Sequence, residues 1–234
     1  MKYSLTFALL GALTSYLAVS LGGWWYLLLW FAISFFTLSA GYAGVGPRVF
    51  SKQPDGTIPL WVKIIHFPFL LYSALVWHIT RIVSRENPFD KVEADLIIGR
   101  RLRVKELPHG VVNYVDLTAE FEDPREIRHS TNYVSVPILD AGVPEPDALR
   151  SAISRLSPGM TFVHCAQGHG RTGLFTLVLL AERGRIQSFD EGMAVIKQAR
   201  PGIGFNRTQD QFIRSYVAGL KKGSDPFSAE KEGL

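Results

Sequence analysis

Two long apolar runs at the start of the chain restrict its fold more than any other feature of the sequence. Residues 4–21 and 24–41 contain no Asp, Glu, Lys or Arg, and each is close to the roughly 20 residues that a helix needs to cross a bilayer. Neither run has a polar face that would suit the surface of a soluble protein. Because only Gly22 and Gly23 separate the runs, the sequence predicts a transmembrane helical hairpin within residues 1–45.

Two alternatives compete with the hairpin. A cleaved signal peptide has a shorter apolar core that is followed by polar mature sequence, and the second apolar run does not fit that pattern. A pair of buried core helices would be equally apolar, and this alternative stays open.

Basic residues gather directly after the hairpin. Residues 46–105 hold ten Lys or Arg and five Asp or Glu, and a basic segment beside anionic headgroups gains roughly 1 kcal/mol per charge. Lys2 precedes the apolar runs, and Arg48 and Lys52 follow them. The positive-inside rule therefore predicts an integral membrane protein with both ends of the hairpin in the cytoplasm. The chain has one cysteine and cannot form an internal disulfide, which agrees with a reducing compartment.

A third apolar stretch, residues 58–82, lies within a basic and aromatic-rich juxtamembrane segment, residues 46–88. A lysine, two histidines and Pro68 interrupt this stretch. We interpret it as one helix, or two pieces broken near Pro68, that lies in the membrane interface. Aromatic side chains are expected at headgroup depth, namely those of Trp61, Tyr72 and Trp77. The alternative is a third crossing, which would place the rest of the chain on the other side of the membrane.

Residues 89–222 have the composition of a soluble α/β domain, and the polar residues 223–234 are expected to form a flexible tail. The predicted strands are residues 94–104 (a strand pair or one strand with a turn at Gly99), 110–120, 132–140 and 160–165. The predicted helices are residues 146–156, 172–183, 189–200 with Ser188 in a capping box, and a last helix capped by Asn206 that runs to residue 220. Strands that alternate with helices predict an α/β fold, with a central mixed sheet flanked by helices.

The motif VHCAQGHGRTG, residues 163–173, carries a cysteine and an arginine between a predicted strand and a predicted helix. Glycines in such a loop let successive backbone N–H groups point inward and bind a tetrahedral oxyanion at the helix N-terminus. The same dipoles lower the pKa of a cysteine from about 8.5 into the range of roughly 3.5–7.5, so we expect Cys165 to be a nucleophilic thiolate. Arg171 can bind two phosphate oxygens through its planar guanidinium, and Thr172 places a hydroxyl beside the sulfur.

The backbone of the same loop is expected to bind phosphate, through Ala166, Gln167, Gly168, His169, Gly170 and Arg171. The alternative is a core cysteine that ends a strand before a tight turn. A papain-type site would need a His base and an orienting Asn or Asp held elsewhere, and the sequence does not indicate one. It also shows no cluster with the spacing of metal ligands, so neither a metal nor another cofactor is expected.

Over roughly residues 89–220 the chain resembles the protein tyrosine phosphatase superfamily, in its small dual-specificity branch. The resemblance rests on HCAQGHGRTG, on ADLIIGRRL, VDLTAE and VPILD before it, and on ARPGIGFNRTQDQFI after it. Within the superfamily this region most resembles the branch that contains phosphatidylglycerophosphate and phosphoinositide phosphatases, and membrane-linked bacterial members. The resemblance implies the cysteine phosphatase fold and a general acid on a mobile loop before the signature, which corresponds to Asp140.

The residues themselves also favour Asp140 as the acid. Expulsion of an alkoxide or phenoxide needs a proton donor, and the loop of Asp140 follows a strand that we expect to neighbour the strand of Cys165. The alternative is a turn aspartate that bonds to its own backbone. Asp147 is the second candidate for the acid, although it fits the first turn of a helix, and Asp116 is expected to be structural.

Together these features predict a membrane-anchored phosphomonoester phosphatase, with Cys165 forming a phosphocysteine while Asp140 protonates the leaving oxygen. The substrate stays open between a phospholipid headgroup phosphate, favoured slightly by the anchor, and a protein phosphorylated on Tyr, Ser or Thr. The loop residues Ala166, Gln167 and His169 include no Lys or Arg, which argues against a highly phosphorylated headgroup.

A catalytically inactive phosphate-binding or scaffolding membrane protein is the alternative function. The expected partners are membrane lipids and the phosphorylated substrate. Nucleic acid is not expected, because the basic residues lie beside the apolar runs and no aromatic platform accompanies them. The sequence does not indicate an oligomeric state.

Overall fold

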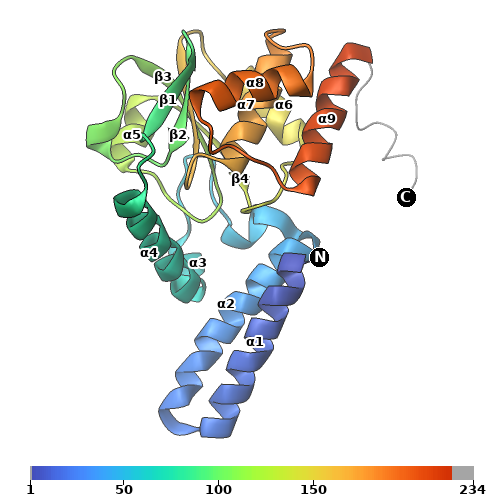
Figure 1. Ribbon diagram of the computed structural model, residues 1–234. Coiled ribbons are helices and arrows are strands. Elements are labelled where there is room, and N and C mark those ends of the chain that lie inside the picture. The colour runs from blue at the N-terminus through green and yellow to red at the C-terminus, as the bar shows by residue number, and fades with distance from the viewer. Residues whose placement is uncertain (1, 223–234) are drawn as a thin grey trace. The chain divides into compact units, whose positions relative to one another are not determined.

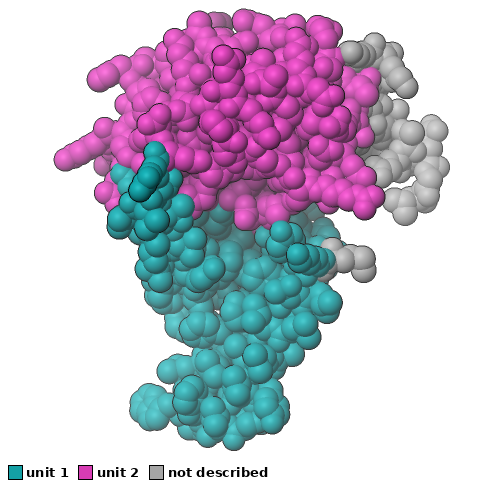
Figure 2. All heavy atoms as spheres, in the orientation of Figure 1, with its two compact units in different colours: residues 1–85, 119–122 teal, residues 86–118, 123–234 magenta. Residues whose placement is uncertain are grey.

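The computed structural model describes residues 2–222, and the chain divides into two compact units (Figure 1, Figure 2). Unit 1 comprises residues 1–85 and 119–122, and unit 2 comprises residues 86–118 and 123–234. The tail predicted to be flexible, residues 223–234, lies outside the described residues.

Unit 1 begins with two apolar helices that lie side by side as a hairpin (Figure 1). Helix α1 spans Lys2–Leu21 and helix α2 spans Leu28–Ala40, with a 3-10 helix, η1 (Gly23–Leu27), between them. Gly22 and Gly23 have positive φ angles of 64° and 56°, which glycine adopts without the steric penalty of other residues. The predicted pair of helices is confirmed, and two helical segments, Lys2–Leu21 and Gly23–Phe50, are long and apolar enough that they could cross a membrane.

The two helices of the hairpin pack closely. A Cβ added at Gly11 would lie 2.9 Å from a ring atom of Phe36, so the glycine is what lets this ring approach the backbone of α1. Near the open end of the hairpin, Ser39 Oγ donates a hydrogen bond of 2.9 Å to the carbonyl oxygen of Ser4. Small residues that admit close helix contact and hydroxyls that bond between helices are typical of helix pairs in membranes.

Further helices follow the hairpin in unit 1. Helices η2 (Gly41–Val45) and η3 (Gly46–Phe50) follow α2, and α3 (Leu60–Ile65) and α4 (Phe67–Val83) follow after a loop. The chain breaks between α3 and α4 at His66, which matches the second of the two predicted forms, two pieces broken near Pro68. Trp61 and Tyr72 are exposed, but the side chain of Trp77 is only 4% exposed, with the guanidinium of Arg81 5.3 Å from its ring centroid. The placement of these three aromatic side chains at headgroup depth stays a prediction.

Unit 2 contains a mixed sheet, as predicted. Its five strands lie in the order β1-β2-β5-β3-β4. The strands are β1 (Phe89–Glu93), β2 (Leu96–Arg100), β3 (Val111–Thr118), β4 (Asn132–Ile138) and β5 (Met160–Cys165). Strand β1 is antiparallel to β2, and the other neighbouring pairs are parallel. Strand β5 therefore lies at the centre of the sheet, with β2 and β3 on its two sides.

Two sequence expectations about the sheet are wrong. Gly99 lies inside β2 and not in a turn, because it pairs with Phe89 and His164. A Cβ there would lie 2.4 Å from the carbonyl oxygen of Pro88, so the glycine serves the close approach of β1. Strand β4 neighbours β3 and not β5, so the loop that carries Asp140 does not follow a strand adjacent to that of Cys165.

The helices of unit 2 cover both faces of the sheet. They are α5 (Arg125–Ser130), α6 (Pro146–Ser154), α7 (Gly170–Glu182), α8 (Phe189–Ala199) and α9 (Arg207–Lys222), with a 3-10 helix η4 (Val104–Glu106). Helices α6 to α9 gather on one side of the sheet and α5 lies on the other (Figure 1). The predicted caps are confirmed, because Ser188 Oγ accepts from Glu191 N and Asn206 Oδ1 accepts from Gln209 N.

The core of unit 2 has a larger and a smaller part, because alternate residues of each central strand point to opposite faces. Val163 and Cys165 belong to the larger cluster with the buried residues of α7, whereas Phe162 packs with Tyr114 and Ile127 in the smaller one. Ten consecutive residues of α7, from Arg171 to Leu180, are buried. This helix is thus fixed against the sheet along its length, and its N-terminus is fixed with it.

Candidate active site

The loop of residues 165–171 joins the carboxyl end of β5 to the N-terminus of α7. The carboxyl ends of the central strands are where α/β sheets most often bind ligands. A helix N-terminus adds unpaired backbone N–H groups and a partial positive charge. Local sequence and topology therefore place this loop where an anion is bound most easily.

Cys165 is buried, and its surroundings favour the charged form of its sulfur. Gly168 N donates a hydrogen bond of 3.2 Å to Cys165 Sγ. Burial raises the pKa of the Cys165 thiol, but the charge of Arg171 and hydrogen bonds from Thr172 and from the backbone of His169 outweigh it, so the net pKa is below the ordinary value. The thiolate is therefore the form that this loop stabilises.

Thr172 lies in the first turn of α7 and is fully buried. Its hydroxyl has no nitrogen or oxygen as a hydrogen-bond partner within residues 2–222, whereas it acts on the sulfur of Cys165 and lowers the pKa of that thiol. A buried hydroxyl without a partner is costly, and a charged sulfur supplies that partner. The structure thus brings Thr172 and Cys165 together.

Gly168 is the residue on which the loop geometry depends. Its φ angle is 79°, in the left-handed region, and a Cβ there would lie 2.4 Å from the carbonyl carbon of Gly99. The loop also receives a hydrogen bond of 3.3 Å from Arg101 N to the carbonyl oxygen of Ala166. Only a glycine at this position lets the loop lie against the end of β2 in this conformation.

Arg171 and Asp140 meet at the loop. The Arg171 side chain is 2% exposed and its Nη2 lies 3.4 Å from Asp140 Oδ1. Arg171 Nη1 donates to the carbonyl oxygen of Ile138 at 3.0 Å, which fixes the guanidinium. Asp140 comes from the loop after β4 and its side chain is 80% exposed, so one edge of Arg171 faces a carboxylate that solvent and substrate can reach.

Two residues that the sequence did not assign to the site hold the loop of Asp140 in place, and one of them, Asn206, was predicted only as a helix cap. Asn206 Nδ2 donates to the carbonyl oxygen of Ala141 at 2.7 Å, and Gln209 Nε2 donates to that of Gly142 at 3.0 Å. Ala141 has a positive φ of 58°, a strained conformation that such bonds stabilise. Asp147 lies instead in the first turn of α6 and pairs with Arg150.

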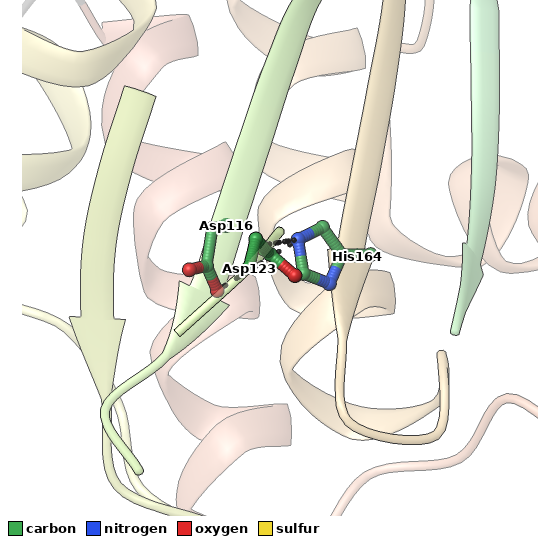
Figure 3. Close-up of side chains that lie close together, drawn as sticks. All are labelled: Asp116, Asp123 and His164. Carbon is green, nitrogen blue, oxygen red and sulfur yellow. Dashed lines mark ion pairs between the residues drawn. The ribbon is translucent and has the colours of Figure 1, made fainter. Parts of the chain in front are cut away.

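A buried polar cluster lies beside β5, on the face of the sheet opposite to α7. His164 Nε2 is 3.1 Å from Asp123 Oδ2 and 3.8 Å from Asp116 Oδ1 (Figure 3). Burial lowers the pKa of His164, and the two carboxylates raise it by more than burial lowers it. The net pKa is therefore above the ordinary value. His164 Nδ1 lies 3.2 Å from the carbonyl oxygen of Cys165, which links the cluster to the loop.

The three residues of this cluster also have the atom types that could hold a metal ion. In this structure His164 Nε2 and Asp123 Oδ2 contact each other directly at 3.1 Å as an ion pair. Asp116 already accepts hydrogen bonds from Thr118 and from the Tyr133 hydroxyl. The cluster is best described as an ion-pair network, and it supports the expectation that Asp116 is structural.

Arg200 is the other functional candidate that sequence reasoning missed. It follows the last residue of α8, and its side chain is 2% exposed. Arg200 donates hydrogen bonds to the carbonyl oxygens of Gln167 and Gly168 in the loop. The segment ARPG after α8 was the available signal, but a basic residue before a proline is usually a solvated helix end.

No family model matches the chain. Over 83 residues it is 36% identical to a protein of Invertebrate iridescent virus 3 named "Putative tyrosine phosphatase 067L", a match that covers 31% of this chain and 35% of the viral protein. The matched region thus spans about a third of the viral relative's length.

Two solved structures share the architecture of unit 2. "PTPMT1 in complex with PI(5)P" has a TM-score of 0.50 at 13% identity and covers 58% of this chain and 99% of that chain. Human DUSP28 has a TM-score of 0.50 at 18% identity and covers 58% of this chain and 97% of that chain. Unit 2 therefore has the fold of the protein tyrosine and dual-specificity phosphatases, and the predicted resemblance is confirmed at the level of the fold.

Proposed function

We propose that this chain, which carries the fold of the dual-specificity phosphatases, is a membrane-anchored phosphatase that hydrolyses phosphomonoesters through Cys165. The observation that carries the proposal is the convergence of three groups on one loop: a sulfur whose pKa is lowered, a buried guanidinium, and the Asp140 carboxylate 3.4 Å from that guanidinium. A nucleophile, an anion clamp and a proton donor are the three parts that this reaction needs.

In the first step the Cys165 thiolate attacks phosphorus, an S–P bond forms, and the P–O bond to the leaving group breaks. Asp140 in its protonated form gives its proton to the departing oxygen, so an alcohol or phenol leaves. The backbone N–H groups of the loop and the Arg171 guanidinium bind the three remaining phosphoryl oxygens, where charge accumulates.

In the second step the Asp140 carboxylate takes a proton from water, and the water oxygen attacks phosphorus. The S–P bond breaks, inorganic phosphate forms, and the sulfur leaves as a thiolate. The Thr172 hydroxyl stabilises that thiolate, because it lies beside the sulfur and has no other partner within residues 2–222. No metal takes part in either step as we propose it.

For the substrate we propose a phospholipid with a phosphomonoester headgroup, with a phosphorylated protein as the second candidate. Two apolar helices that could cross a membrane would hold unit 2 near headgroups, and a structural neighbour of unit 2 was crystallised with PI(5)P. The loop residues other than Arg171 carry no Lys or Arg, which favours a headgroup with one phosphomonoester over a highly phosphorylated one. We place both ends of the hairpin in the cytoplasm, on the positive-inside rule.

The test compares full-length protein in detergent with Cys165→Ser, which removes the thiolate and changes one atom. Phosphate release is measured from a small aryl phosphate, a phosphotyrosine peptide, and mixed micelles of phosphatidylglycerophosphate. Release by the wild type and at least a thousandfold less by Cys165→Ser is expected, because the whole first step depends on the sulfur. A wild type that releases phosphate from none of the three would favour a phosphate-binding or scaffolding protein instead.

A further inference from the structure

Each nitrogen of the Arg200 guanidinium donates a hydrogen bond within unit 2. Its Nε donates to the carbonyl oxygen of Gly168 at 2.9 Å, and its Nη2 donates to that of Gln167 at 3.2 Å. On its other side Nη1 donates to Asp90 Oδ2 at 2.7 Å and to the carbonyl oxygen of Asn87 at 3.1 Å. A buried guanidinium in such a network fixes the groups that it bonds, because moving any one of them leaves a charged donor unsatisfied.

Glu86 links this arginine to the loop by a second route. Glu86 Oε2 accepts from Arg200 Nη2 at 3.0 Å and lies 2.8 Å from His169 Nε2. Gly202 makes room for the contact, because a Cβ there would lie 2.4 Å from Glu86 Oε1 and 2.9 Å from His169 Nε2. One carboxylate therefore holds both the arginine behind the loop and the imidazole that projects from it.

These bonds act on the orientation of the loop backbone. Arg200 holds the carbonyl groups of Gln167 and Gly168, while Gly168 N points to Cys165 Sγ. A carbonyl that is tied down on the outer side of a loop fixes the peptide plane, and the N–H group of the next residue is then directed inward. The backbone N–H of His169, which helps to lower the pKa of Cys165, belongs to the peptide plane of the Gly168 carbonyl.

We propose that Glu86 is a positioning residue for the phosphate-binding loop, acting through Arg200 and His169. The proposal rests on the phosphatase function proposed above. Glu86 follows Val83, the last residue of α4, by three positions, so the chain that leaves the juxtamembrane helix is the chain that holds the loop. Glu86 itself is not expected to touch the reacting atoms.

The experiment uses the full-length protein in detergent with three substitutions at Glu86 and one control. Glu86→Ala removes both contacts, Glu86→Asp shortens the side chain so that it cannot reach both partners, and Glu86→Gln keeps the length and an acceptor oxygen without the charge. The control is Glu93→Ala, on β1, which removes an ion pair of 3.3 Å with Arg185 instead.

Two readouts are measured for each variant. The first is kcat and KM on a small aryl phosphate. The second is the pH dependence of alkylation by iodoacetamide, which reports on Cys165 alone because the chain has one cysteine. The alkylation profile depends on the geometry of the loop and needs no phosphatase activity, so a failure of the proposed function and a failure of the role of Glu86 are distinguishable.

Glu86→Ala and Glu86→Asp are expected to lower kcat by about tenfold to a hundredfold, the range for small misplacements at a reacting centre. They should also move the alkylation midpoint to higher pH. Loss of a negative charge alone would move it to lower pH, so the direction separates positioning from simple electrostatics. Glu86→Gln should stay within about threefold of the wild type, and Glu93→Ala within about twofold.

The proposal is overturned if Glu86→Asp matches Glu93→Ala in kcat, KM and alkylation midpoint, whatever its melting temperature. The same conclusion follows if Glu86→Gln loses as much as Glu86→Ala, since the contact geometry would then not be what matters. If Glu86→Ala does not fold, the Asp and Gln variants still decide between these outcomes.

Discussion

At the scale of single residues, the reactivity of this site depends on a balance at one sulfur. Cys165 sits where burial alone would keep its thiol neutral, and Arg171, Thr172 and the loop backbone reverse that preference. Removing the charge of Arg171 or the hydroxyl of Thr172 should raise the pKa of Cys165.

Thr172→Val tests the hydroxyl with almost no change of side-chain shape. The lowered pKa of Cys165 means that the thiolate is present above that pKa and is lost as the pH falls through it. Without the hydroxyl the pKa rises, so the acid limb of the kcat/KM profile should move to higher pH. A hydrogen bond to a charged group contributes about 1.5–3 kcal/mol, and kcat should fall by roughly tenfold to a hundredfold.

The control for this variant is Thr176→Val, one turn further along α7, whose hydroxyl bonds to the carbonyl oxygen of Thr172. It removes a buried hydroxyl from the same helix without touching the sulfur. If both variants shift the acid limb equally, the shift is caused by a change in helix α7 and not by loss of the hydrogen bond to Cys165.

Asp140→Asn tests the general acid. An amide cannot give a proton to the leaving oxygen, so kcat for an alkyl phosphate should fall by about a hundredfold to ten-thousandfold. The loss should be much smaller for a nitrophenyl phosphate, whose leaving group needs little protonation. Asp147→Asn, at the N-terminus of α6, is the matched control and should change kcat less than about twofold. A large loss that is equal for both leaving groups would exclude Asp140 as the acid.

At the scale of elements, sequence reasoning succeeded where local chemistry decides the structure. Strand β5, the glycine loop and α7 were predicted within two residues, because an apolar run, a glycine cluster and a second apolar run leave few alternatives. The caps at Ser188 and Asn206 were predicted because a side-chain oxygen three residues before a backbone N–H is a local signal.

The failures concern partners that lie far apart in the sequence. Gly99 carried a turn signal, yet its role is to admit the carbonyl oxygen of Pro88, the residue before the neighbouring strand β1. The order of β3, β4 and β5 is set by crossover connections that the strand patterns do not encode. Arg200, which lies 114 positions from Glu86, shows no local pattern that distinguishes a buried arginine from a solvated one. Helices α5 and η4 are six and three residues long, too short for a periodic signal.

Gly173→Ala tests how the first turn of α7 is held. A Cβ at this position would lie 2.6 Å from Ile203 Cγ2 and 3.0 Å from the ring of Phe205. The overpacking should lower the free energy of unfolding by about 1–3 kcal/mol, and the melting temperature by roughly 2–12 °C. Gly204→Ala, in the segment that Gly173 contacts, is the control, because a Cβ there would have nothing within 4 Å. Equal melting temperatures for the two variants would contradict this packing.

At the scale of the whole molecule, the chain combines a unit with the fold of the dual-specificity phosphatases with an apolar unit that could enter a membrane. The two parts differ in what buries their apolar side chains. In unit 2 the core is formed by the chain itself, whereas the hairpin leaves many large apolar side chains exposed, including Leu9, Val19 and Trp24. Exposed apolar surface on this scale indicates a membrane or a partner.

We predict that the full-length protein stays in the membrane pellet after washing with alkaline carbonate and is released by detergent. Two transmembrane helices resist such washing, because their removal would expose their apolar surface to water. A variant with one Asp in each helix, Leu9→Asp and Ile33→Asp, should be released, since each buried charge costs about 2.5–3.5 kcal/mol in a membrane. Release of the unmodified protein by carbonate alone would contradict the transmembrane hairpin.

The central claim is that phosphate passes through the sulfur of Cys165. The most direct measurement is rapid acid quenching of the full-length protein during turnover of an aryl phosphate, followed by mass spectrometry of its peptides. We predict one added phosphoryl group, located on Cys165, in the wild type, with more of it in Asp140→Asn, because water activation in the second step is slowed. A phosphoryl group on any other residue, or phosphate release by Cys165→Ser at the wild-type rate, would contradict the account.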